Sequence, residues 1–118
     1  MYGVDADLDL SDFVGRRVVN VLAGKNQVQL QLYPEGTISV EGRLEVQGEN
    51  RRTIGIWEQG QEDFPENIQA LVGSRITAAH AEPPDSVVFE VEGGFSVCLI
   101  DTSEVYESFQ LEPGGIIV

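Results

Sequence analysis

Two segments of the chain share one nine-residue pattern. They read Leu10-Ser11-Asp12-Phe13-Val14-Gly15-Arg16-Arg17-Val18 and Ile68-Gln69-Ala70-Leu71-Val72-Gly73-Ser74-Arg75-Ile76. Both fit apolar-x-x-apolar-Val-Gly-x-Arg-β-branched, and they align without a gap at an offset of 58 residues. Apolar residues at positions i, i+3 and i+4 line one side of a helix, and glycine provides the left-handed residue that ends it. Each segment therefore predicts a short helix followed by a strand.

The similarity continues on the carboxyl side of both segments. Val28–Leu32 matches Val87–Val91 after an insertion of one residue, and Gly36–Val40 matches Gly93–Val97. Apolar residues alternate along Val28–Leu32, which is typical of a strand with one buried face. We therefore interpret the chain as an internal duplication. Two copies are too few for a solenoid, so we expect them to pack face to face around a pseudo-twofold axis.

These patterns predict a mainly β fold. We expect an internally duplicated antiparallel β-sandwich or barrel-like meander of nine or ten short strands, with two short helices. The 118 residues fit a single domain. Within it we expect a flexible amino terminus at 1–9, a first half at 10–57, a connector at 58–67 and a second half at 68–118. The apolar end Ile116-Ile117-Val118 needs a sheet partner, which makes a homodimer through an edge strand one prediction.

Acidic residues dominate the charge. Twenty Asp and Glu stand against seven Lys and Arg, which gives a net charge of −13, and residues 76–118 hold eight acids without one Lys or Arg. Nucleic acids and anionic membranes are bound through basic side chains, so we expect neither as a direct partner. A concentrated acidic surface favours a basic protein partner, because opposite charges speed association. The plainer interpretation is that the charge keeps a small protein soluble.

A cytoplasmic location is expected from the absence of export and membrane signals. The sequence contains no apolar run of about 18 residues. Met1 is followed by Tyr2-Gly3-Val4-Asp5, with no basic segment leading into an apolar one.

Residues suited to catalysis are scarce. The chain has one cysteine, Cys98, and one histidine, His80. Cys98 falls inside an expected strand with no cations close in sequence, and a lone histidine lacks the nucleophile and the orienting partner of a triad. We therefore expect a protein that is not an enzyme, with no catalytic residues, no cofactor and no metal ion.

Several motifs together carry a resemblance. They are the repeated apolar-x-x-[Phe/Leu]-Val-Gly-x-Arg-[Val/Ile] segment, an alternating strand, a glycine turn into Ile/Phe-Ser-Val, and Val105-Tyr106-Glu107-Ser108-Phe109 before the closing strand. In this order they resemble an uncharacterised family of small bacterial duplicated β-domains, over roughly residues 8–118. Such domains are similar in size, acidity and lack of catalytic motifs to immunity proteins of toxin–immunity systems, which bind a toxin and block its active site. The resemblance implies a β fold and an inhibitory role, and it carries over no binding residue.

These features favour an acidic binding protein that neutralises a basic partner, such as a nuclease toxin or a nucleic-acid-binding defence complex. Acidic side chains would mimic phosphates, and aromatic side chains would anchor the interface. Trp57 and Tyr106 each have two interpretations, because an aromatic residue beside acids is a good anchor and an equally good core residue. The expected partner-binding residues are Glu90, Glu92, Asp101, Glu104, Glu107, Trp57 and Tyr106.

The alternative function is a phage or bacterial sponge that sequesters a small anionic nucleotide-type ligand. Pairing of Arg17 with Arg75 across the duplication would create equivalent sites at arginine-lined interfaces. This function requires the arginines to converge on a pocket, whereas otherwise they neutralise neighbouring acids. The candidate ligand-binding residues are Arg16, Arg17, Arg51, Arg52 and Arg75.

Overall fold

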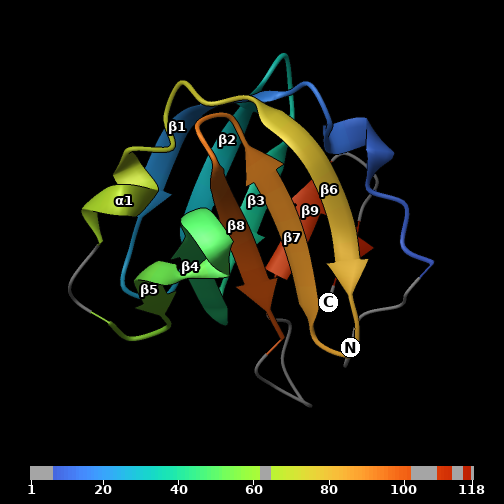
Figure 1. Ribbon diagram of the computed structural model, residues 1–118. Helices are drawn as coiled ribbons and strands as arrows, with labels where there is room; N and C mark the ends of the chain where they lie inside the picture. The colour runs from blue at the N-terminus through green and yellow to red at the C-terminus, as the bar shows by residue number, and fades with distance from the viewer. Residues whose placement is uncertain (1–6, 62–64, 102–108, 113–115, 118) are drawn as a thin grey trace.

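Strands dominate the computed structural model, which describes residues 7–61, 65–101, 109–112 and 116–117. Ten strands in these residues form two antiparallel sheets of five strands each. The sheets pack face to face as a sandwich rather than a closed barrel (Figure 1). The predicted mainly β fold is confirmed, and the sandwich is the correct one of the two expected architectures.

The elements of the first half are η1 (Ser11–Phe13), β1 (Arg17–Ala23), β2 (Val28–Tyr33), β3 (Thr37–Val40), β4 (Arg43–Gln47), η2 (Glu49–Arg51) and β5 (Thr53–Glu58). Those of the second half are α1 (Glu66–Gln69), β6 (Ile76–Glu82), β7 (Ser86–Val91), β8 (Phe95–Ile100), β9 (Phe109–Glu112) and β10 (Ile116–Ile117). The back sheet in Figure 1 has the order β1-β2-β3-β9-β10, and the front sheet has the order β5-β4-β8-β7-β6.

Each sheet combines strands of both halves. Strands β1, β2 and β3 are joined by β9 and β10, while β6, β7 and β8 are joined by β4 and β5. The first five strands therefore occupy the same positions as the last five, and a pseudo-twofold axis relates the halves. Each half completes its sheet only with two strands of the other.

The registers of β1 and β6 repeat as well. A bulge interrupts the β1–β2 ladder between Val18 and Asn20, and a bulge interrupts the β6–β7 ladder between Ile76 and Ala78. These positions differ by 58 residues, which is the offset of the sequence repeat. Local conformation is therefore repeated along with sequence.

The expected match of Gly36–Val40 with Gly93–Val97 is wrong by two residues. The sheet registers make Ile38 equivalent to Val97, and Gly36 equivalent to Phe95. The expected match aligned the glycines of the two turns with each other, but residues with positive φ lie at different points in these turns. Gly36 comes after the turn between β2 and β3, whereas Gly93 and Gly94 both lie inside the turn between β7 and β8.

The inner faces of the sheets form one hydrophobic core. Val28, Leu30 and Leu32 are buried, and the glutamines between them remain partly exposed, as the alternation predicts. Phe13 of η1 meets Phe89 of β7 edge to face, with ring centroids 5.4 Å apart. Burying a side chain of this kind contributes about 1.5–3 kcal/mol. The core therefore includes the short helical turns as well as the strands.

Both predicted short helices are present, each reduced to a single turn. η1 is a 3-10 turn, and α1 is one turn of α-helix. Gly15 and Gly73 follow them with φ values of +93° and +95°, the left-handed conformation that glycine adopts most readily. These glycines end the turns as the sequence predicts.

The turn around η2 lies over the outer face of the front sheet, where Figure 1 draws it in green before β4 and β8. Cys98 and Val88 are register partners that do not belong to the core between the sheets, yet they are buried. Arg51 crosses this face to Glu82 of β6, with a nitrogen–oxygen distance of 2.7 Å. The β4–β5 connection therefore covers side chains that a bare sheet would expose.

Candidate functional site

Glu90 and Glu92, two of the predicted partner-binding acids, lie at the end of β7 and in the turn that follows. Both side chains are exposed, and neither forms an ion pair within the described part of the chain. Oε1 of Glu92 accepts a hydrogen bond from the backbone N–H of Arg75 at 2.8 Å. The N–H of Glu92 donates to the Arg75 carbonyl oxygen at 3.0 Å. The Glu92 carboxylate is thus held in place by the backbone of Arg75, with no ion pair to a cation among the described residues.

Trp57 and Asp101 do not contribute to an accessible binding surface, which corrects the prediction. Trp57 is 1% exposed, because it points inward from β5 opposite Leu44 and joins the hydrophobic core. Asp101 is 7% exposed, and its backbone N–H donates to the carbonyl oxygen of Asp85 at 2.7 Å. The core interpretation of Trp57 is therefore the correct one. The other expected partner-binding residues, Glu104, Tyr106 and Glu107, lie outside the described residues.

A pocket of about 380 Å³ opens beside Glu92, and we call it the α1 pocket. Its lining residues come from α1 and the turn after it, from the β7–β8 turn and the start of β8, and from edge strand β5. Ligand sites of this size combine an apolar lining with a few polar groups. The lining here follows that pattern, with Ile54, Leu71, Phe95, Asn67, Ser74 and Glu92.

The close approach of α1 to β5 depends on Gly55. A Cβ atom at this position would lie 2.5 Å from Oδ1 of Asn67 and 3.3 Å from Cβ of Pro65, so the Asn67 side chain would have to shift. Leu71 is almost fully buried, whereas Ile54 and Phe95 are 40% and 42% exposed. The α1 pocket therefore has one wall fixed in the core and two half-exposed apolar side chains.

A second hollow of about 420 Å³ adjoins the α1 pocket, because Ile54 and Phe95 line both. The remaining lining comes from the η2 turn and includes Glu49 and Arg52. These two hollows lie next to each other at the end of the front sheet where β8 begins.

Titratable side chains also gather on the outer face of β6, β7 and β8. The two carboxylate oxygens of Glu82 meet Arg51 at 2.7 Å and His80 at 3.0 Å. The hydrogen bond from Arg51 lowers the pKa of Glu82, and the histidine contact adds to this shift. Burial raises the pKa of the Cys98 thiol. Because the thiolate is the reactive form, Cys98 is a poor nucleophile at neutral pH.

The five arginines of the sponge hypothesis have different partners. Arg16 donates to two backbone carbonyl oxygens, Arg51 pairs with an acid of β6, and Arg52 lines the second hollow. The backbones of Arg17 and Arg75 form an isolated antiparallel bridge, and Nη1 of Arg17 donates to the carbonyl oxygen of Gly73 at 3.3 Å. Among these five residues, the described structure pairs only Arg17 and Arg75 with each other.

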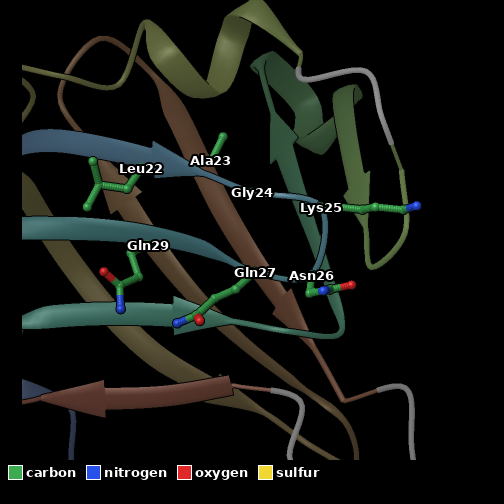
Figure 2. A pocket seen from close by; sticks show the side chains of 7 residues that line it. All are labelled: Leu22, Ala23, Gly24, Lys25, Asn26, Gln27 and Gln29. Atoms are coloured by element: carbon green, nitrogen blue, oxygen red, sulfur yellow. The ribbon is translucent and has the colours of Figure 1, made fainter.

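The β1–β2 hairpin borders a further pocket of about 450 Å³, shown in Figure 2. Its turn is tied to the chain after β5, because the N–H of Gly60 donates to the carbonyl oxygen of Lys25 at 2.7 Å. Aliphatic and amide groups prevail in its lining, which includes Leu22, Asn26, Gln27 and Gln29. No predicted site residue lines this pocket, and it lacks the acids that a basic partner would contact.

Two residues of the α1 pocket, Ser74 and Phe95, escape prediction from the sequence. Ser74 aligns with Arg16 in the repeat, and this difference is visible in the sequence itself. The expected match of Phe95 with Ile38 predicts an inward-facing core residue, whereas Phe95 is 42% exposed. A comparison of the two halves position by position, in the correct register, is the signal that finds them.

Across the residues that the structure describes, no helix has the length and apolar character needed to cross a bilayer. In the same residues, no three His, Cys, Asp or Glu side chains come together in a group that could hold a metal ion. A scan against protein-family models, a search of curated proteins and a search of solved structures each found no match for this chain.

Proposed function

We propose that this protein is a non-enzymatic acidic binding protein that neutralises a basic protein partner by occluding its active or binding surface. The partner class is a nuclease toxin or a nucleic-acid-binding defence protein, whose phosphate-binding surface is rich in Lys and Arg. One observation carries the proposal. Glu92, which forms no ion pair with any described residue, lines the α1 pocket together with the half-exposed Ile54 and Phe95.

The distribution of charge supports this function. Glu90 and Glu92 are exposed and unpaired among the described residues, whereas Arg43 and Arg51 are already paired with acids. A net charge of −13 attracts cationic proteins and speeds their encounter. The apolar residues of the α1 pocket supply a dry centre, and the acids supply a polar rim, which is the usual anatomy of a protein interface.

The test is affinity capture followed by titration of charge variants. The tagged full-length chain is incubated with lysate of its host at low and high salt, and a retained basic protein is purified and titrated calorimetrically. We expect an affinity that falls as salt rises, since screening weakens attraction between exposed charges. We expect the double variant Glu90→Gln/Glu92→Gln to bind about tenfold more weakly, because two exposed pairs contribute about 0.2–1 kcal/mol each.

The matched control is the double variant Asp7→Asn/Glu41→Gln. It removes the same charge from residues outside the α1 pocket and should bind like the native chain. Equal losses in both double variants, or an affinity independent of salt, contradict the proposal.

A second candidate function, sequestration of a small anionic nucleotide-type ligand, has one observation in its favour. Arg17 and Arg75 form a non-hydrogen-bonded antiparallel pair, whose side chains lie on one face at the closest spacing of such a ladder. Like charges directly opposite each other are destabilising, and an anion between them would relieve the repulsion.

Thermal unfolding with inorganic phosphate and with a nucleoside monophosphate tests this second function. Ligand bound only to the folded state raises the melting temperature. The sponge function predicts a rise for the native chain and none for Arg17→Gln/Arg75→Gln. The same melting temperature with and without either compound contradicts it.

A further inference from the structure

We propose that the α1 pocket binds the guanidinium group of an arginine side chain supplied by the basic partner. The inference rests on the proposed function and names the group that enters the pocket. Its basis is a comparison of the two halves of the molecule at equivalent positions. Where the second half has this pocket, the first half holds an arginine of its own chain.

Residues 10–18 and 68–76 share one backbone conformation. The N–H of Arg16 donates to the carbonyl oxygen three residues earlier at 3.2 Å, and the N–H of Ser74 does the same at 2.9 Å. The glycine before each of them has almost the same positive φ. Ser74 therefore occupies the position of Arg16.

Arg16 joins η1 to the β2–β3 turn. Its Nε donates to the carbonyl oxygen of Asp12 at 2.7 Å, and its Nη1 donates to that of Glu35 at 2.6 Å. By the 58-residue offset of the repeat, the first equivalent carbonyl group belongs to Ala70. By the sheet registers, the second belongs to Gly94. The second half thus has a carbonyl group at both sequence positions, in a β7–β8 turn whose left-handed residues differ from those of the β2–β3 turn.

Ser74 is too short to make this connection. Its side chain has a single atom beyond Cβ, so it cannot span from the turn after α1 to the β7–β8 turn as a longer side chain does. The α1 pocket of about 380 Å³ opens between these two turns, and Ala70, Ser74 and Gly93 are among its lining residues. The pocket is therefore the counterpart of the site that Arg16 occupies.

Two further differences between the halves favour binding of an arginine supplied by the partner protein. Glu92 takes the position of Tyr33, and Phe95 takes the position of Gly36. A carboxylate forms charge-assisted, often bidentate hydrogen bonds with a guanidinium. An aromatic ring attracts the same group to its face. At this place the second half thus has Ser74 where the first has Arg16, together with an acid and an aromatic ring.

Arginine fits this arrangement better than lysine. The guanidinium is planar, carries five donors and is weakly hydrated, so it can meet two carbonyl oxygens and a carboxylate at once. An ammonium group is a compact and strongly hydrated charge, and it does not stack on a ring in the same way. The partner segment is therefore one that presents an exposed arginine.

The test is an NMR titration of the full isotope-labelled chain with acetyl-arginine amide. Acetyl-citrulline amide serves as the neutral isostere, and acetyl-lysine amide tests the choice of cation. We expect saturable shifts at the backbone N–H groups of Ser74, Gly93 and Phe95 with the arginine compound. Binding of the citrulline and lysine compounds should be at least about tenfold weaker, because charge and planar geometry are both required.

Three variants define the site. Ser74→Arg should abolish binding, because the introduced side chain fills the pocket from within. Glu92→Gln should weaken binding about tenfold, since it removes the charge and keeps an oxygen that accepts from Arg75 N–H. Glu41→Gln is the control and should bind normally. It lies just before Arg43, the β4 residue that pairs with Ile100 at the far end of β8, whereas the pocket is at the β8 start.

Arginine-specific shifts that disappear in Ser74→Arg and weaken in Glu92→Gln support the site. Equal shifts with the citrulline compound, or unchanged binding by both variants, overturn it. A titration with acetyl-tetralysine amide separates this result from failure of the proposed function. Salt-dependent shifts at Glu90 and Glu92 with that peptide, but no shifts in the pocket with acetyl-arginine amide, overturn the arginine site alone. No shifts with either compound overturn both proposals.

Discussion

Arg17 and Arg75 pair with each other at the pseudo-twofold axis of the molecule. Around them, four backbone hydrogen bonds form two equivalent pairs. They run from Gly15 to Ile76 at 2.8 Å, from Gly73 to Val18 at 2.7 Å, from Val18 to Ser74 at 2.9 Å, and from Ile76 to Arg16 at 2.8 Å, each from N–H to carbonyl oxygen. The first strands of the two sheets are therefore joined at this axis, and the axis relates the α1 pocket to the Arg16 site.

Gly15→Ala and Gly73→Ala are predicted to lower the free energy of unfolding by equal amounts. Neither new Cβ meets another atom within 4 Å, so the loss comes from a backbone with φ near +90° that only glycine adopts freely. We expect each variant to lose about 1–2 kcal/mol of unfolding free energy in urea. Gly48, with φ of −98°, is the control position for alanine. If only one of the two variants loses stability, the two turns are not equivalent.

Trp57 is predicted to report the core rather than an interface. It is the single tryptophan of the chain and is 1% exposed, so its fluorescence should be blue-shifted and resistant to quenching by acrylamide. Acrylamide is preferable to iodide, which a chain of charge −13 repels. Trp57→Ala should lose about 3–5 kcal/mol of stability, the usual cost of a large core truncation. Red-shifted, readily quenched emission in the native chain would place Trp57 at the surface.

The Cys98 thiol is predicted to react slowly with iodoacetamide at neutral pH. Burial raises its pKa, so little thiolate forms, and Cys98 as a residue is only 5% exposed. We expect labelling in the native chain to be many-fold slower than in the urea-unfolded chain, measured by mass spectrometry. Comparable labelling rates in the two states would contradict the finding that Cys98 is covered on the outer face of the front sheet.

The ion pair of Arg51 with Glu82 is predicted to make stability depend on pH in a defined direction. Because the folded-state pKa of Glu82 lies below its ordinary value, the pair stabilises the fold above the unfolded-state pKa and loses this effect as pH falls through the folded-state pKa. Both side chains are partly exposed, so Glu82→Gln should cost only about 0.2–1 kcal/mol at neutral pH.

Urea unfolding of the native chain and of Glu82→Gln, between about pH 7 and pH 3, measures this difference. The two stabilities should converge at the acidic end. A difference in stability between the native chain and Glu82→Gln that grows as pH falls contradicts this prediction.

The sequence predicts the fold well where the signals are local. Alternation along Val28–Leu32 and the repeated glycine turns define strands and helical turns without knowledge of their neighbours. The exchange of β4 and β9 between the halves is not predicted by such local signals, because strand pairing is decided by contacts between residues far apart in the chain. Trp57 shows the same limit, since its neighbouring acids are a local signal and its burial is not.

The candidate site is less predictable than the fold. Glu92 is identified by its charge, but Ser74 and Phe95 carry no chemistry that singles them out. Their importance follows from what stands at the same place in the other half. The expected match, two residues out of register, paired Phe95 with Ile38 and concealed its equivalence to Gly36. A small shift in register is enough to hide a site, because it exchanges inward-facing and turn positions.

A crystal structure of the Ser74→Arg variant shows whether the α1 pocket is the Arg16 site without its arginine. We expect the introduced guanidinium to donate to the carbonyl oxygens of Ala70 and Gly94, as Arg16 donates to those of Asp12 and Glu35. An introduced side chain that extends into solvent, with the pocket still open, would contradict it.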